Sequence, residues 1–102
     1  MKTIILKDIL AVRSYPEAGD YIFNDIKDCI IKNDKVVFDM SEVMSVPTMF
    51  LNTSFGAIID EFGVQKLKSS ISFRNISKTQ IDRIQKYIND YFQTFASNNL
   101  NN

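Results

Sequence analysis

The segment over residues 36–63 joins a short apolar run, a polar loop and an amphipathic stretch, and it constrains the fold most. Residues 36–38 are too few for a helix and are β-branched or aromatic. They predict a strand buried on both faces, which Asp39 ends. After Pro47, helical spacing predicts an α-helix with one apolar face. That face holds Leu51, Ser54, Phe55, Ile58, Ile59 and Phe62, with Gly63 as the expected C-terminal cap.

The remaining segments alternate between the two kinds of secondary structure. They are a strand over residues 3–6, extended to Val12 in one interpretation; a helix over 14–32 that Ser14 and Glu17 begin; a connector over 64–66; a strand over 67–73; and a helix over 77–95 that Ser77 and Gln80 begin. The order is therefore β-α-β-α-β-α. Right-handed crossovers between such strands predict a small α/β domain. Its mainly parallel or mixed sheet of about three to five strands carries amphipathic helices.

One core is expected from a chain of 102 residues. The domain is predicted over residues 1–95, followed by a disordered Asn-rich tail over 96–102. Cys29 lies on the apolar side of its helix and is interpreted as a small core residue. Five further side chains are expected to be buried together: Ile26, Phe38, Phe55, Ile58 and Ile88.

The composition favours a binding protein over an enzyme. The chain has no histidine, which removes the commonest general base and most zinc sites, and its three glycines match no phosphate-binding motif. No metal and no cofactor are expected. Twelve basic and twelve acidic residues cancel, so the charge favours neither a nucleic acid nor a membrane as partner. A single cysteine and no long apolar run predict a cytoplasmic protein.

Polar residues after the central strand form the candidate site. Asp39, Ser41 and Ser45 would line a crevice at the carboxyl end of that strand, where a small ligand or a nucleotide is one possible occupant. An alternative role for Asp39 is to accept hydrogen bonds from loop N–H groups. Asn52 and Thr53 are expected on the exposed face of the helix that follows. Phe50 lies off the apolar stripe, where it is either an exposed anchor for a partner or packed against a neighbouring helix.

The run of residues 36–43, three apolar residues followed by Asp39, an apolar residue, Ser41, any residue and a valine, resembles STAS domains. These are the anti-sigma-factor antagonists and the cytoplasmic domains of sulfate transporters. The helix start over residues 47–50 is more similar to STAS-like proteins of the DUF4325 type. An arginine before the first helix and an asparagine after the last strand are typical of that group, and Arg13 and Asn75 match them.

The resemblance implies a bacterial regulatory module that binds proteins and catalyses nothing. Its partner would be a kinase-like ATPase or an anti-sigma factor. STAS antagonists are phosphorylated on a serine at the helix start, and Thr48 occupies that position as a candidate phosphosite. Pro47 and Phe50 stand where the antagonists have aspartate and glycine. A phosphate on Thr48 would suit a helix N-terminus, and the alternative is that Thr48 only caps the helix.

Overall fold

A computed structural model describes the backbone of residues 1–100 and the side chains of residues 1–91. Its elements are β1 (Lys2–Ile5), α1 (Leu6–Ala11), α2 (Tyr15–Ile31), β2 (Val36–Asp39), α3 (Thr48–Leu51), the π-helical turn η1 (Asn52–Gly56), α4 (Ala57–Phe62), α5 (Val64–Ser70), β3 (Ile71–Arg74) and α6 (Lys78–Leu100). The tail expected over 96–102 stays a prediction, because its side chains and all of positions 101 and 102 lie outside the described residues.

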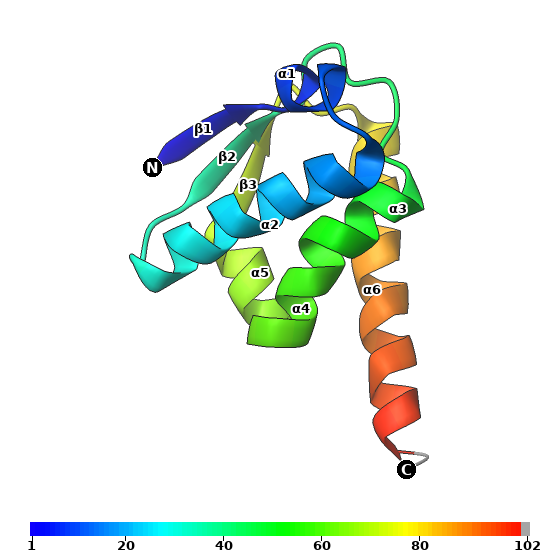
Figure 1. Cartoon of the computed structure of the whole chain (residues 1–102). Coiled ribbons are helices and arrows are strands. Elements are labelled where there is room, and N and C mark those ends of the chain that lie inside the picture. The colour runs from blue at the N-terminus through cyan, green and yellow to red at the C-terminus, as the bar shows by residue number, and fades with distance from the viewer. Residues whose placement is uncertain (101–102) are drawn as a thin grey trace.

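The three strands form one parallel sheet in the order β1-β2-β3, as Figure 1 shows. Val36 of β2 lies opposite Lys2 of β1 and Ile71 of β3, so the strands are in register over their four residues. The predicted α/β class with a mainly parallel sheet is confirmed, at the smallest strand number expected. No helix in the part of the chain that the structure describes is long and apolar enough to cross a membrane.

The helices cover one face of this sheet. Val36 and Phe38 of β2 are buried, whereas Val37 between them is half-buried. Its neighbours on the same face, Thr3 of β1 and Ser72 of β3, are exposed. The expectation that β2 is buried on both faces was therefore wrong. Because successive side chains point to opposite sides of a strand, only one of every two residues meets the helical layer.

Two of the predicted strand boundaries were also wrong. The first strand ends at Ile5, and α1 replaces its extension to Val12. Residues 64–70 form α5 instead of a connector and the start of a strand. Leu67 and Ser70 are the buried residues of α5 and lie three positions apart, which is helical spacing. The alternation of apolar residues with serine suggested a strand there, and it holds only from Ile71 onward.

The predicted helix after Pro47 is one continuous ribbon from α3 through η1 to α4 (Figure 1). Gly63 ends it with a φ of 90°, and its N–H donates to the Ile59 carbonyl at 2.9 Å. Phe55 on this helix packs edge-on against Phe38, with 5.8 Å between the ring centroids, and against Phe73 at 6.1 Å. The five side chains expected to share the core are all buried in it, as is Cys29.

Helix α2 crosses η1 at very close range. The approach depends on Gly19, which is buried and has no side chain. A Cβ at this position would lie 1.6 Å from the Thr53 Oγ1 and 2.9 Å from the Phe50 carbonyl oxygen. Both distances are shorter than van der Waals contact, so any side chain at position 19 must push the two helices apart.

Gly19→Ala should therefore lower the free energy of unfolding by about 1–3 kcal/mol, the usual cost of overpacking a core. Thr53→Ala removes the nearest clashing atom, so the double variant should recover part of that loss. Denaturant melts of the two single variants and the double variant give the coupling energy directly. A Gly19→Ala protein as stable as the original, or a double variant that shows no recovery, would mean that the helices do not cross at this distance.

Candidate functional site

The β2–α3 loop, residues 40–47, alternates between buried and exposed side chains. Val43 and Val46 are buried, with 7% and 2% of their surface exposed. Between them Met44 is 93% exposed, and Ser45 is also at the surface. Exposing a methionine to this degree forgoes the free energy of burying an apolar side chain. The loop therefore displays an apolar residue while its two valines anchor it to the core.

Two side chains of helix α6 hold this loop by donating hydrogen bonds to carbonyl groups of the loop. Gln80 donates its side-chain amide to the Val43 carbonyl oxygen, and Arg83 Nε donates to the Val46 carbonyl oxygen at 3.2 Å. Gln80 also forms the predicted capping box, since its side chain accepts from the Ser77 N–H and its own N–H donates to Ser77 Oγ. Sequence reasoning found the capping box and missed both bonds to the loop. The one sequence feature that relates to these bonds is the pair of long hydrogen-bond donors, a glutamine and an arginine, three residues apart on one helix.

Thr48 is the first residue of α3, and its side chain does not cap the helix. The capping position is held by Pro47, and no side-chain capping bond forms. The Thr48 hydroxyl is exposed, and its Oγ1 accepts a hydrogen bond from Arg83 Nη2 at 3.2 Å. The same guanidinium therefore touches both the loop and the candidate phosphosite. Met49, the next residue, is 57% exposed.

Asp39 ends β2, and its carboxylate binds the chain around it. Its Oδ1 accepts from the Ser41 N–H at 3.0 Å, from the Ser41 hydroxyl at 2.7 Å and from Asn75 Nδ2 at 3.2 Å. Arg74 Nη2 lies 3.6 Å from the other oxygen. The hydrogen bonds from Ser41, then that from Asn75 and the charge of Arg74, hold the pKa of Asp39 well below its ordinary value. The carboxylate accordingly fastens the start of the loop to the end of β3.

Two residues assigned to an exposed partner surface lie elsewhere. Phe50 is 1% exposed, so the alternative in which it packs against neighbouring helices is the observed one. Thr53 is half-buried against Gly19 of α2, and its hydroxyl donates to the carbonyl oxygens of Met49 and Phe50. The Thr53 side chain and the Phe50 carbonyl oxygen both lie close to Gly19 of α2. Asn52 is exposed as expected, and its Oδ1 accepts from the Tyr87 hydroxyl of α6.

The predicted crevice residues divide into two separate groups. Asp39 and Ser41 bond to each other, whereas Ser45 borders a different hollow of about 230 Å³ between the loop and α1. Lys7 of α1 pairs with Glu42 of the loop at its edge. This hollow is smaller than the roughly 300–1,000 Å³ of typical ligand clefts. Among the described residues no three His, Cys, Asp or Glu side chains cluster as a metal site would require.

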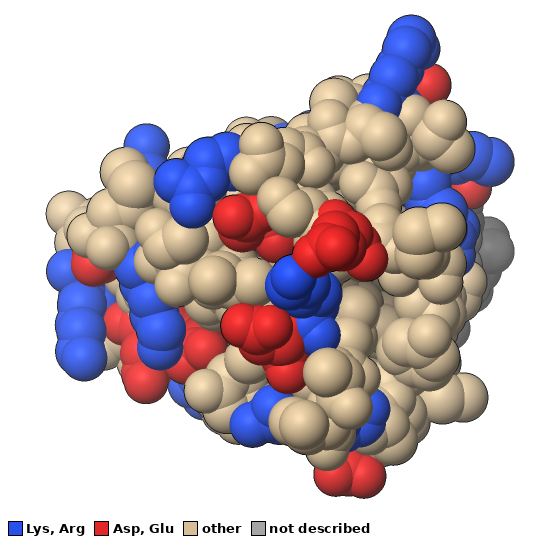
Figure 2. All heavy atoms as spheres, turned by 90° about the horizontal axis from the view of Figure 1, so that it is seen from above, with Lys and Arg blue, Asp and Glu red and all other residues tan. Residues whose placement is uncertain are grey.

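Figure 2 looks onto the end of the molecule that carries α1 and the β2–α3 loop. Acidic and basic side chains lie side by side near the centre of this face, so neither sign of charge dominates it. The part over the loop and α3 is mostly uncharged in the same view. The segment over residues 43–59 indeed contains no charged residue. This end of the protein therefore offers a partner polar and apolar contacts and no strong electrostatic field of one sign.

A model of the family described as "STAS-like domain of unknown function (DUF4325)" matches residues 18–80, more than half of the chain. The protein belongs to this family. The match runs from α2 to the start of α6, and it includes β2, the loop and α3. No curated protein and no solved structure gave a significant match. The resemblance stated from the sequence is thus confirmed, and in this STAS-like domain Asn75 and Arg74 tie the end of β3 to Asp39.

The lowered pKa of Asp39 predicts how stability depends on pH. A carboxylate whose pKa is lower in the folded state stabilises the fold above its unfolded pKa of about 4, and that contribution is lost as pH falls through the folded value. The stability gap between the original protein and Asp39→Asn should therefore be constant above about pH 5 and shrink below about pH 4. Denaturant melts across this range measure the gap.

Asp8→Asn is the matched control, because Asp8 is exposed and has no hydrogen bond or ion pair among the described residues. The gap for Asp8→Asn should stay near zero throughout. A gap for Asp39→Asn that stays the same from pH 7 down to about pH 3 would mean that the carboxylate does not hold these donors.

Proposed function

We propose that this STAS-like domain is a non-catalytic regulatory module that binds a protein partner through the β2–α3 loop and the start of α3. The single observation that carries the proposal is the exposure of Met44 and Met49, at 93% and 57%. They flank Thr48 in a segment without charge. Flexible methionines suit an interface that packs against an apolar partner surface. A kinase-like ATPase or an anti-sigma factor is the proposed partner class.

The site is better suited to binding than to proton transfer. A general base needs a carboxylate or imidazole free to accept a proton from substrate. Asp39 points its Oδ1 at three donors of its own chain, and their bonds favour the ionised form. The small hollow beside Ser45 and the separation of Ser45 from Asp39 give the alternative of a small-ligand site no support.

Phosphorylation of Thr48 is the proposed switch. A phosphate carries about −1.5 to −2 charges and bonds well to guanidinium groups. Arg83 Nη2 already contacts the Thr48 hydroxyl, which is exposed to a modifying enzyme. Pairing with Arg83 would hold the phosphate without unfolding α3, and the new charge between Met44 and Met49 would oppose an apolar partner. The modification should therefore weaken binding and leave the fold intact.

The surface can be tested with a Met44→Ser/Met49→Ser protein used as bait in extracts of the source cells. Because both side chains are exposed, its denaturant melt should change by no more than about 0.5 kcal/mol. Partners captured by the original protein and quantified by mass spectrometry should be depleted about tenfold. Ile31→Ser is the matched control, since Ile31 is 67% exposed at the end of α2 and away from the loop.

Ile31→Ser should capture the same partners as the original protein. The surface is wrongly placed if the methionine variant retains every partner that Ile31→Ser retains. The proposal of a regulatory binding module fails as a whole if no protein is enriched by the original domain over an unrelated bait of the same size.

The switch is tested with Thr48→Glu and Thr48→Ala in the same capture assay. Thr48→Glu, which supplies one charge at this position, should weaken capture at least about threefold, while Thr48→Ala should bind normally. Both should melt within about 1 kcal/mol of the original protein. Mass spectrometry of the domain isolated from its source cells should find phosphate on Thr48. An unmodified Thr48 together with normal binding by Thr48→Glu would remove the switch and leave the interaction surface standing.

A further inference from the structure

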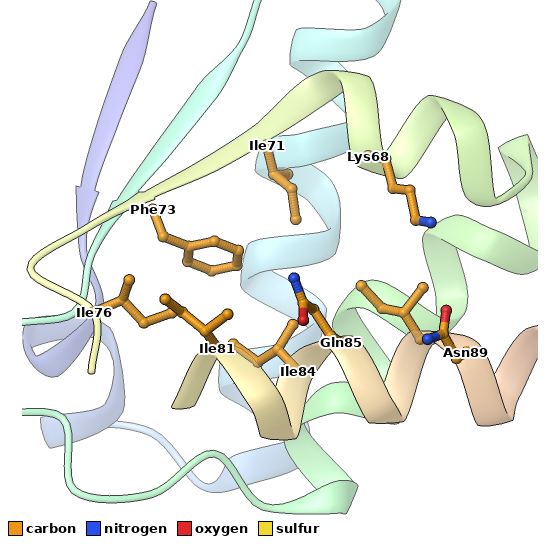
Figure 3. Close-up of a pocket in the computed structure, with 9 residues that line it drawn as sticks. Lys68, Ile71, Phe73, Ile76, Ile81, Ile84, Gln85 and Asn89 are labelled. Carbon is orange, nitrogen blue, oxygen red and sulfur yellow. The ribbon is translucent and has the colours of Figure 1, made fainter. Parts of the chain in front are cut away.

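A second apolar surface lies between β3 and α6, far along the chain from the β2–α3 loop. A groove of about 460 Å³ separates the two elements. In Figure 3, Ile71 and Phe73 of β3 point towards α6, and Ile81 and Ile84 of α6 point back towards β3. Ile81 is 37% exposed although it is apolar. The groove is thus lined by aliphatic and aromatic side chains, of which Ile81 is exposed and Ile84 and Ile88 are buried.

One edge of β3 borders this groove, and its backbone groups are directed outward. The Met40 N–H donates to the Arg74 carbonyl at 2.9 Å, so Arg74 directs its backbone groups at β2. Ser72 does the same, because alternate residues of a strand share a direction. The N–H and C=O of Phe73 must then point away from β2. β3 is the outer strand of the described sheet, so this edge has no strand beside it there.

The charges around the groove are unbalanced. Lys68 of α5 lies at the end where β3 begins, and Gln85 and Asn89 of α6 supply the other polar groups. The lining contains no aspartate or glutamate, and Lys68 makes no ion pair among the described residues. An occupant with a carboxylate at this end would therefore find a cation without a competing partner.

We propose that the β3 groove binds an extended peptide segment of a partner protein, which adds to the sheet as a fourth strand antiparallel to β3. Its backbone pairs with the outward N–H and C=O of Phe73. Its inward side chains are apolar and fill the groove over Ile81 and Ile84. An acidic residue near its C-terminal end meets Lys68, because an antiparallel segment ends where β3 begins.

A strand fits the groove better than a compact small molecule does. Neighbouring strands lie about 4.8 Å apart, so a segment paired with β3 would lie above α6 and turn alternate side chains onto it. A small apolar acid would use the groove and Lys68 and leave the Phe73 backbone groups without a partner. This interaction is independent of the surface at Met44 and Met49, so a protein could engage either site alone.

The test uses a synthetic peptide of about seven residues in which isoleucine alternates with threonine and the last residue is glutamate, with both ends blocked. Isothermal titration should show saturable binding to the whole domain. At saturation, the amide hydrogen of Phe73 should exchange with deuterium at least about tenfold more slowly, because it becomes a ladder donor. A peptide with glutamine in place of the glutamate should bind about threefold more weakly.

Two pairs of variants locate the contact. Ile81→Lys should weaken binding about tenfold or more, whereas Ile31→Lys, which changes a more exposed isoleucine elsewhere, should not. Lys68→Glu should weaken it at least about threefold. Lys66→Glu is its matched control, since Lys66 is exposed on the same helix and does not line the groove. Melts of all four variants should confirm that they remain folded.

Three results would overturn the proposal. One is no binding at about 1 mM peptide, and another is binding that Ile81→Lys leaves unchanged. The third is an occupant of another kind. Either octanoate binds in the groove without protecting the Phe73 amide, or a second copy of the domain occupies the groove in a dimer that Ile81→Lys dissociates. Each of these leaves the proposed role of the β2–α3 loop untouched.

Discussion

Packing on one face of a three-stranded sheet is the constraint on which the rest of this STAS-like domain depends. Phe38 lies at the centre of that face, with Phe55 of η1 and Phe73 of β3 both about 6 Å away between ring centroids. A single buried face offers little area to a small domain. The helices must therefore approach closely, and α2 does so at Gly19, where the η1 side chain of Thr53 fills the space of the missing Cβ.

This arrangement leaves the loop after β2 at the end of the sheet, where it contacts α1 and α6. Three separate interactions then shape the loop. Asp39 accepts a hydrogen bond from the Ser41 N–H near the start of the loop. Val43 and Val46 are buried in the core. Gln80 and Arg83 of α6 donate to two carbonyl groups of the loop. The exposed residues of the loop and of the start of α3 are then Glu42, Met44, Ser45, Thr48 and Met49. The surface proposed to bind a partner is thus presented by a loop fixed on both sides, which lowers the conformational cost of binding.

Local patterns in the sequence predicted those parts of the fold that depend on near neighbours. Helical spacing located the core side of the helix after Pro47, and the two capping boxes marked the starts of α2 and α6. The pattern failed where short segments support two interpretations. Residues 67–70 were joined to the alternating run that begins at Ile71, but the buried residues Leu67 and Ser70 have helical spacing and belong to α5.

The candidate site was harder to predict because it depends on contacts between distant residues. Sequence patterns did not place Asp39 beside Asn75, although each matched a separate feature of the family, and the contact of Arg83 with Thr48 spans 35 positions. Periodicity carries no information about such pairs. Phe50 is a second example of a residue whose burial periodicity did not predict. It lies off the main apolar stripe of its helix and is nevertheless buried, because a second helix, α2, lies beside it.

Residue-resolved amide hydrogen exchange of the free domain tests most directly whether a rigid core on one face of the sheet holds a β2–α3 loop that is open to solvent. Phe38 of β2 and Ile58 of α4 should exchange only through global unfolding, with opening free energies equal to the stability from denaturant melts. Met44 and Ser45, whose N–H groups have no hydrogen bond among the described residues, should exchange close to the rate of an unstructured peptide. Protection of Met44 as strong as that of Phe38, or exchange of Phe38 through local opening, would contradict the account.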